Sequence, residues 1–142
     1  MTSYLLDTNV VSELVKPRPQ ETVLRWLADQ HDSHLFFSAV SVGEVRRGIV
    51  ELPAGRKRQT LEQWYTGLKG PREWFGARIL AFDERAAEAW AELVAEGRRK
   101  GRPRSPIDMM IAATAIVHGL TVASLNQRDF EGVVAHLNPV RT

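Results

Sequence analysis

Cysteine is absent from the 142-residue chain, and glycine and proline are sparse, at 10 and 7 residues. Without cysteine the protein has no disulfide, no thiolate zinc site and no cysteine nucleophile, and this usage suits a reducing compartment, so we expect a cytoplasmic protein. The longest mainly apolar run, Met109 to Val117, is too short to span a bilayer, so we expect no membrane association. The chain start lacks a basic segment followed by an apolar one, so we expect no secretory signal.

The rest of the composition is that of an ordinary globular chain, with 44% hydrophobic and 25% charged residues. No repeat or linker divides the sequence, so we expect a single domain over residues 1–142. The net charge of +2 decides little, but arginine and lysine cluster at 46–47, 56–58 and 98–104. These clusters are either solvated helix ends or a surface that follows the phosphates of a nucleic acid.

Short apolar runs alternate with longer stretches of helical periodicity. The runs predict strands at 4–6, 35–37, 79–82 and 120–123, and a short fifth strand at 134–137. The periodic stretches predict helices at 10–16, 23–27, 42–52, 56–69, 84–100 and 105–118. In the 56–69 helix the inward stripe is expected to include Trp64, Tyr65 and Leu68. This alternation predicts an α/β fold with a central, mostly parallel sheet of four to five strands and helices on both faces.

Four acidic residues stand out by position, three of them where the chain leaves a predicted strand or enters a predicted helix. They are Asp7, Glu44, Asp108 and Asp129. Helix capping explains several of them locally, because Ser41–Glu44 and Ser105–Asp108 have capping-box spacing and Asp7 precedes a helix. If the four converge, each close pair repels by about 4 kcal/mol at ~4 Å and an effective dielectric near ~20, more than the ~1 kcal/mol of a cap. Such a cluster needs protons or a cation, and oxygen-only ligands indicate Mg²⁺ or Mn²⁺.

Other residue types offer weaker signals. Only His31 and His34 have ligand-like spacing, and no third ligand lies nearby, so we expect no zinc site. The four tryptophans are spread over different segments, which favours core or dimer-surface roles over a base-stacking platform. A glycine-rich nucleotide-binding motif is missing. A phosphoacceptor receiver domain is disfavoured, because no lysine follows a late strand.

Four blocks in order along the chain resemble the PIN-domain nucleases: Leu5–Asn9, Ser38–Glu44, Asp108–Ala115 and Ser124–Phe130. Within that group the chain is similar to the VapC-type ribonuclease toxins of bacterial toxin–antitoxin pairs. The resemblance implies a PIN-like three-layer fold and a Mg²⁺-dependent endoribonuclease, for which Mn²⁺ can substitute. It also implies an RNA substrate, a cognate antitoxin protein as partner and a homodimer.

The resemblance assigns catalytic roles to the same four acids, Asp7, Glu44, Asp108 and Asp129. We expect Asp7 and Asp108 to hold the metal directly, with Glu44, Asn126 and Asp129 in the outer shell or at a second metal position. Leu125 stands where relatives often carry arginine, so one positioning contact lacks its usual residue. The residues expected to position substrate are Thr8, Asn9, Arg46, Arg47, Arg102 and Arg104.

A second hypothesis keeps the fold but not the activity. In a catalytically weak RNA- or protein-binding module, the acids would serve only as helix caps. The two hypotheses differ in whether Asp7, Glu44 and Asp108 meet in space, since only a shared site makes them a metal-binding set.

Overall fold

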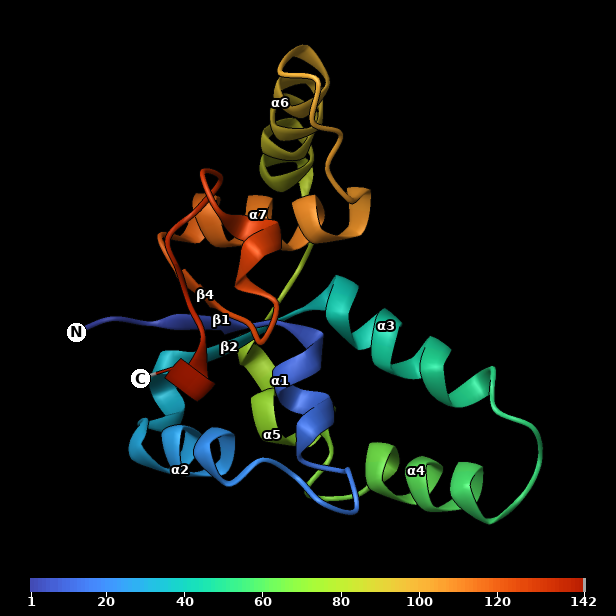
Figure 1. Ribbon diagram of the computed structural model, residues 1–142. Helices are drawn as coiled ribbons and strands as arrows, with labels where there is room; N and C mark the ends of the chain where they lie inside the picture. Colours follow the sequence, from blue (N-terminus) through green and yellow to red (C-terminus); the bar gives the residue numbers. More distant parts are fainter. Residues whose placement is uncertain (142) are drawn as a thin grey trace.

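The computed structural model describes residues 1–141 and contains a five-stranded sheet in which all paired strands are parallel (Figure 1). The strands are β1 (Tyr4–Leu6), β2 (Leu35–Ser38), β3 (Ile79–Leu80), β4 (Thr121–Ala123) and β5 (His136–Leu137). Their order is β3-β2-β1-β4-β5, which puts β1 in the centre. The predicted α/β class and parallel sheet are confirmed. The third strand is shorter than predicted, because the chain leaves it at Leu80 to reach Asp83, the N-cap of the next helix.

Helices occupy most of the remaining chain. The α-helices are α1 (Thr8–Glu13), α2 (Glu21–Asp29), α3 (Ala39–Val50), α4 (Arg56–Thr66), α5 (Pro71–Phe75), α6 (Glu84–Arg99) and α7 (Pro106–His118). Short 3₁₀ helices are η1 (Asp32–His34), η2 (Gly76–Arg78), η3 (Gln127–Phe130) and η4 (Pro139–Arg141). None of the helices described between residues 1 and 141 has the length and hydrophobicity needed to cross a bilayer.

Two differences from the expected helices have local causes. Helix α4 ends at Thr66, with Gly67 as its C-cap, so Leu68 lies beyond the helix and is 87% exposed; its predicted place in the inward stripe was wrong. Helix α5 was not predicted. Its first residue is Pro71, at a position whose N–H has no intrahelical partner in any case, so proline starts the helix without cost.

The sheet separates two hydrophobic cores, which gives the three-layer arrangement expected from the resemblance (Figure 1). Neighbouring residues of β1 point to opposite faces. Leu5 packs with Met109 and Ile111 of α7, on the face that α6 and α7 cover. Leu6 packs in the other core, with residues of α1, α2, α3, α4 and α5.

Three strands end at the same edge of the sheet. In the parallel register Leu6 lies beside both Phe37 of β2 and Ala123 of β4. The residues that follow these positions, Asp7 and Ser124 among them, are therefore neighbours in space although more than half the chain separates them. This is the edge at which α/β folds bind ligands.

Candidate active site

A cavity of about 480 Å³ lies at this edge, and we call it the carboxylate cavity. Its wall carries four carboxylates, several neutral oxygen and nitrogen donors and one cation. The lining residues are Asp7, Thr8, Asn9, Ser12, Lys16, Glu44, Asp108, Asn126 and Asp129. The structure therefore brings together all four predicted acidic residues, along with three predicted neighbours, Thr8, Asn9 and Asn126.

Asp7 is fixed by contacts on both carboxylate oxygens. It is the N-cap of α1, and its Oδ1 accepts the Thr8 N–H at 2.8 Å, as the capping prediction requires. Its Oδ2 accepts the Ser124 hydroxyl at 2.7 Å. Burial raises the pKa of Asp7, the bonds from Ser124 and Thr8 counteract part of this effect, and the charges of Glu44 and Asp129 raise the pKa further. Asp7 is thus a rigidly oriented carboxyl, only 7% exposed, at the floor of the cavity.

Glu44 does not cap a helix. The N-cap of α3 is Ser38, whose Oγ accepts the Val40 N–H at 3.0 Å, so the predicted Ser41–Glu44 capping box was wrong. The helix begins earlier than its apolar spacing indicated, which places Glu44 in the second turn. Its Oε1 instead accepts the Thr8 hydroxyl at 2.6 Å and so ties α3 to α1 beside Asp7.

The third acid, Asp108, lies at the start of α7. Ser105 is the N-cap, as predicted, and its Oγ accepts the Asp108 N–H at 3.3 Å. The pKa of Asp108 is raised to about 6, first by burial, then by the charge of Asp7, by the charge of and a hydrogen bond with Asp129, and by the charge of Glu44. The cavity therefore holds more negative charge than its own groups neutralise.

Asp129 belongs to η3 and completes the acidic wall. It accepts a hydrogen bond from the Asn126 side-chain amide at 2.5 Å. Asn9 has a similar supporting role, because its Oδ1 accepts the Leu125 N–H at 3.1 Å and its Nδ2 donates to Ser124 at 3.3 Å. Asn9 and Asn126, which were predicted to act beside the acidic residues, thus hold the loop that follows β4 in place.

Whether the cavity suits a metal ion depends on its donors. Among residues 1–141, no group of three or more His, Cys, Asp or Glu side chains is already arranged to hold a metal ion. Mg²⁺ commonly takes only one or two carboxylates directly and keeps several waters, so it does not require such a preformed group. The groups that could ligate a metal present carboxylate, hydroxyl and amide oxygens. The pKa values of Asp7 and Asp108 are raised first by burial and then by the charges of the neighbouring carboxylates, which a cation would offset. The donor set fits a hard divalent ion.

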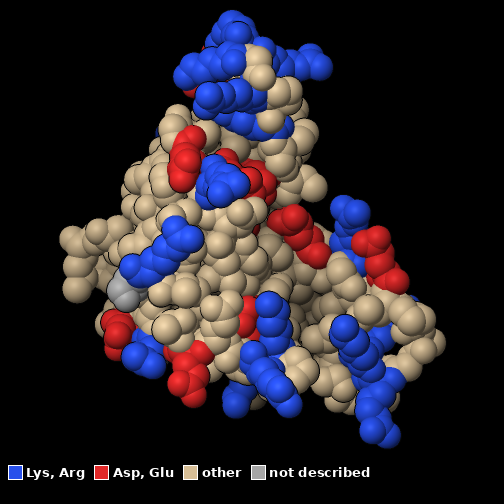
Figure 2. Space-filling model, in the orientation of Figure 1, with Lys and Arg blue, Asp and Glu red and all other residues tan. Residues whose placement is uncertain are grey.

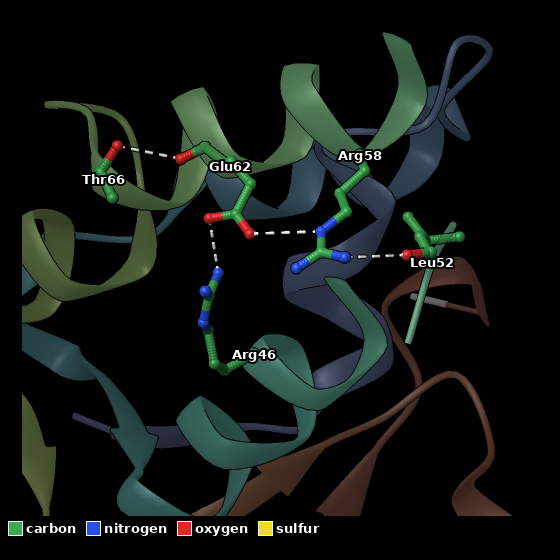
Figure 3. A network of polar contacts seen from close by, with 5 residues as sticks. All are labelled: Arg46, Leu52, Arg58, Glu62 and Thr66. Carbon is green, nitrogen blue, oxygen red and sulfur yellow. Dashed lines mark hydrogen bonds and ion pairs between the residues drawn. The ribbon is translucent and has the colours of Figure 1, made fainter. Parts of the chain in front are cut away.

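Two predicted substrate-positioning residues, Arg46 and Arg47, do not line the carboxylate cavity. At 3.6 residues per turn, Arg46 projects about 200° away from Glu44 on the same helix. Its guanidinium reaches α4 and pairs with Glu62 at 2.7 Å, while Arg58 lies 3.7 Å from the same carboxylate (Figure 3). Arg47 pairs with Glu51 at 3.0 Å. The structure thus places these arginines in the α3–α4 contact and on the outer face of α3.

A second cavity, of about 410 Å³, adjoins the first through Asp129, which lines both. We call it the cationic cleft, because Lys100, Arg102, Arg104 and Arg128 line it. Figure 2 shows basic side chains gathered over the end of α6 and the loop after it. The loop can fold back here because Gly97 has no side chain; a Cβ would lie 2.9 Å from the Arg102 carbonyl oxygen.

The basic side chains of the cleft differ in whether they already pair with other groups of the protein. Arg104 donates to the Leu93 carbonyl at 2.9 Å and to Glu96 at 3.2 Å, and its side chain is only 15% exposed, so it holds the loop against α6. Lys100 also pairs with Glu96, at 3.0 Å. Within residues 1–141, Arg102 and Arg128 are exposed, and their side chains make no hydrogen bond or ion pair.

Sequence reasoning missed Ser124, Lys16 and Arg128 as site residues. Ser124 had a usable signal, since it follows its strand just as Asp7 follows β1. Lys16 and Arg128 had none, because their places depend on how a turn and a 3₁₀ helix close around the cavity.

Comparisons with known proteins agree with this geometry. The family model of the PIN domain matches residues 4–134. The chain is 38% identical over 127 residues to VapC ribonuclease Y4jK of Sinorhizobium fredii, covering 89% of each chain. It is also 38% identical over 136 residues to toxin FitB of Neisseria gonorrhoeae, covering 95% of this chain and 96% of FitB. The crystal structure of FitAcB from N. gonorrhoeae superposes with a TM-score of 0.90 at 36% identity, over 98% of this chain and 99% of that one.

Proposed function

The chain belongs to the PIN-domain family, and on this premise we propose that it is a Mg²⁺-dependent endoribonuclease that cleaves RNA, the toxin of a toxin–antitoxin pair. The observation that carries the proposal is the convergence of Asp7, Glu44, Asp108 and Asp129 on one cavity. Helix capping alone would not gather them, because Glu44 caps no helix and Asp108 stays at the cavity with a raised pKa.

The residues of the carboxylate cavity have different roles in this proposal. Asp7 and Asp108 would hold Mg²⁺ or Mn²⁺, which when bound lowers the pKa of a water nucleophile and stabilises charge on phosphoryl oxygens. Ser124 and the Thr8 N–H keep Asp7 in one orientation. Glu44 and Asp129, each held by a neutral donor, face the same space and can orient water or support a second metal position.

The cationic cleft supports RNA as the substrate. A strand whose phosphate lies at the carboxylate cavity has its neighbouring phosphates within reach of the cleft, because the two cavities share Asp129. In the described chain the side chains of Arg102 and Arg128 have no hydrogen-bond or ion-pair partner and are free to contact phosphate. Arg104, predicted as a contact, instead fixes the loop that carries Arg102.

The double variant Arg102→Gln/Arg128→Gln is expected to bind RNA more weakly, with a KM roughly tenfold higher and a slope of log Kd against log salt smaller by about two. The value of kcat should change little, because the carboxylates are untouched. Arg25→Gln/Arg56→Gln removes two exposed arginines elsewhere and serves as the charge-matched control. An unchanged salt slope in the cleft variant would show that RNA does not cross the cleft.

The direct test of the proposed function is cleavage of labelled single-stranded RNA by the purified full chain in Mg²⁺, in Mn²⁺ and after chelation by EDTA. We expect cleavage with either metal and none in EDTA, with activity restored when metal is returned. RNA binding without cleavage under all conditions would favour the alternative, a binding module of the PIN fold.

The partner and setting follow from the same premise. As a toxin, the chain would be silenced by a cognate antitoxin protein, and we propose this partner together with a homodimer and a cytoplasmic location. The similarity to a ribonuclease and to a toxin supports this reading over nearly the whole chain. Co-expression with the product of the adjacent reading frame, followed by purification, would test for a stable complex.

A further inference from the structure

Among the described residues, the lining of the carboxylate cavity includes one cation, which belongs neither to the proposed metal-binding set nor to the cationic cleft. Lys16 lies in the turn after α1 and, within residues 1–141, is the only basic residue that lines the cavity. Its Nζ lies 2.8 Å from Oε2 of Glu13. Ser12, one turn earlier, lines the same wall.

Glu13 is an unusual partner for a surface lysine. Its side chain is 1% exposed, whereas that of Lys16 is 57% exposed. The Oε1 of Glu13 accepts the Gln20 N–H at 2.8 Å, which fixes the carboxylate against the start of α2. The close contact with the Lys16 ammonium is the main cause that keeps the pKa of Glu13 below its usual range. A buried charge of this kind is costly unless it is paired, so Glu13 restrains Lys16 as much as Lys16 neutralises Glu13.

This restraint changes what Lys16 can do. A free lysine spreads its charge over many rotamers and loses that freedom when it binds a ligand. The Lys16 ammonium is held by Glu13, while the exposed part of the side chain lies at the wall of a cavity rich in carboxylates. A divalent ion would offset only half the charge of four ionised carboxylates, so an incoming phosphate meets net repulsion unless a further cation contributes.

We propose that Lys16, oriented by the buried carboxylate of Glu13, is the phosphate-binding cation of the carboxylate cavity, where its ammonium donates to a non-bridging oxygen of the RNA phosphate being cleaved. Glu13 is a positioning residue that acts through Lys16. The inference rests on the proposed nuclease function and adds a substrate contact that the acidic residues cannot supply.

The test uses three variants of the full chain. Lys16→Met alone leaves Glu13 buried and unpaired, so the informative variant is Glu13→Gln/Lys16→Met, which removes both charges and keeps an acceptor for the Gln20 N–H. Lys16→Arg retains the charge. Lys69→Met, at an exposed lysine outside both cavities, is the control.

Two readouts separate substrate binding from a structural role. Without RNA, the double variant should bind Mn²⁺ roughly threefold more tightly, because the positive charge that is lost lines the cavity, whereas the negative charge lost with Glu13 does not line it. With RNA, its kcat/KM should fall roughly tenfold or more, mainly through KM, and the salt slope of binding should decrease by about one. Lys16→Arg should retain most of the wild-type RNA affinity, and Lys69→Met should match the wild type in both measurements.

The outcomes distinguish this inference from the proposed function. If the wild type cleaves RNA and the folded double variant shows unchanged Mn²⁺ affinity and KM, the role of Lys16 is overturned while the nuclease function stands. If the double variant binds Mn²⁺ more tightly but the wild type cleaves no RNA, the nuclease function is overturned while the contribution of Lys16 to the cavity's charge is supported.

Discussion

Replacing Asp108 by asparagine is expected to lower the rate of RNA cleavage by about a thousandfold, equivalent to ~4 kcal/mol of transition-state stabilisation. Asparagine keeps the shape of the side chain and the N-terminal turn of α7, but it removes one of the two carboxylates proposed to hold Mg²⁺. The measurement is single-turnover cleavage at saturating Mg²⁺, where weaker substrate binding does not obscure the chemical step.

The same substitution is expected to stabilise the metal-free protein. The pKa of Asp108 in the folded chain is about 6, above its ordinary 3.8, so between these values the folded state binds more protons than the unfolded state. The stability contributed by this carboxyl is therefore complete below pH ~4 and is lost as the pH rises through ~6. At pH ~7.5 asparagine should restore about 1–2 kcal/mol after allowance for solvent screening, or roughly 3–6 °C in Tm.

Thermal unfolding in EDTA at pH ~5 and ~7.5 tests this expectation. The Tm advantage of Asp108→Asn should be present at the higher pH and shrink at the lower one. Glu88→Gln, at an exposed acid on α6, should change neither the Tm nor the cleavage rate. If Asp108→Asn unfolds or retains full activity, Asp108 is a structural residue and its assignment to the metal is wrong.

The second large effect is expected for Ser124→Ala. The Ser124 side chain is fully buried, donates to Asp7 at 2.7 Å and accepts the Asn126 N–H at 3.0 Å. Removing the hydroxyl leaves these two groups, and the Asn9 side-chain amide that also donates to it, without this partner, at a cost of about 2–3 kcal/mol in the free energy of unfolding. Because Ser124 also orients Asp7, cleavage should fall roughly tenfold to a hundredfold and require more Mg²⁺.

Asp83→Ala provides a control for this variant, because it destabilises the fold at a place remote from the site. Asp83 caps α6, accepts the Ala86 N–H at 3.0 Å and lines neither cavity. Its loss should cost about 1 kcal/mol and leave cleavage unchanged. Chemical denaturation and a Mg²⁺ titration of the rate measure the two effects separately. If the Ser124→Ala protein is less stable but has the wild-type Mg²⁺ dependence, the Ser124–Asp7 hydrogen bond stabilises the fold and has no role in metal binding.

The parallel sheet was predictable because it follows from short-range patterns, whereas the convergence of the acids could be stated only as a condition. Apolar runs at Tyr4–Leu6 and Thr121–Ala123 have no polar alternation, which is typical of strands buried on both faces. Once the strands are parallel, Asp7 and the segment after β4 must meet at one edge, although they are far apart in the chain. Ser105 and Pro106 likewise indicated the start of α7 correctly.

The remaining features depend on contacts between elements, which local patterns do not contain. Glu44 had the spacing of a capping residue, but Ser38 was available at the end of β2 and starts the helix earlier. The distribution of charge along the sequence did not indicate that Arg46 would pair with Glu62 of another helix, or that the Arg128 side chain would have no ion-pair partner in the described chain. Glu13 is polar on a short helix, and its burial becomes visible only when α2 closes over it.

The strands at the two margins of the sheet, β3 and β5, are each two residues long. An extended peptide laid along either margin would gain too few main-chain hydrogen bonds to add a stable extra strand. Short margins of this kind also give unfolding or newly made chains little template for edge-to-edge aggregation. Any protein that associates with this chain must therefore recognise side chains presented by its helices and loops.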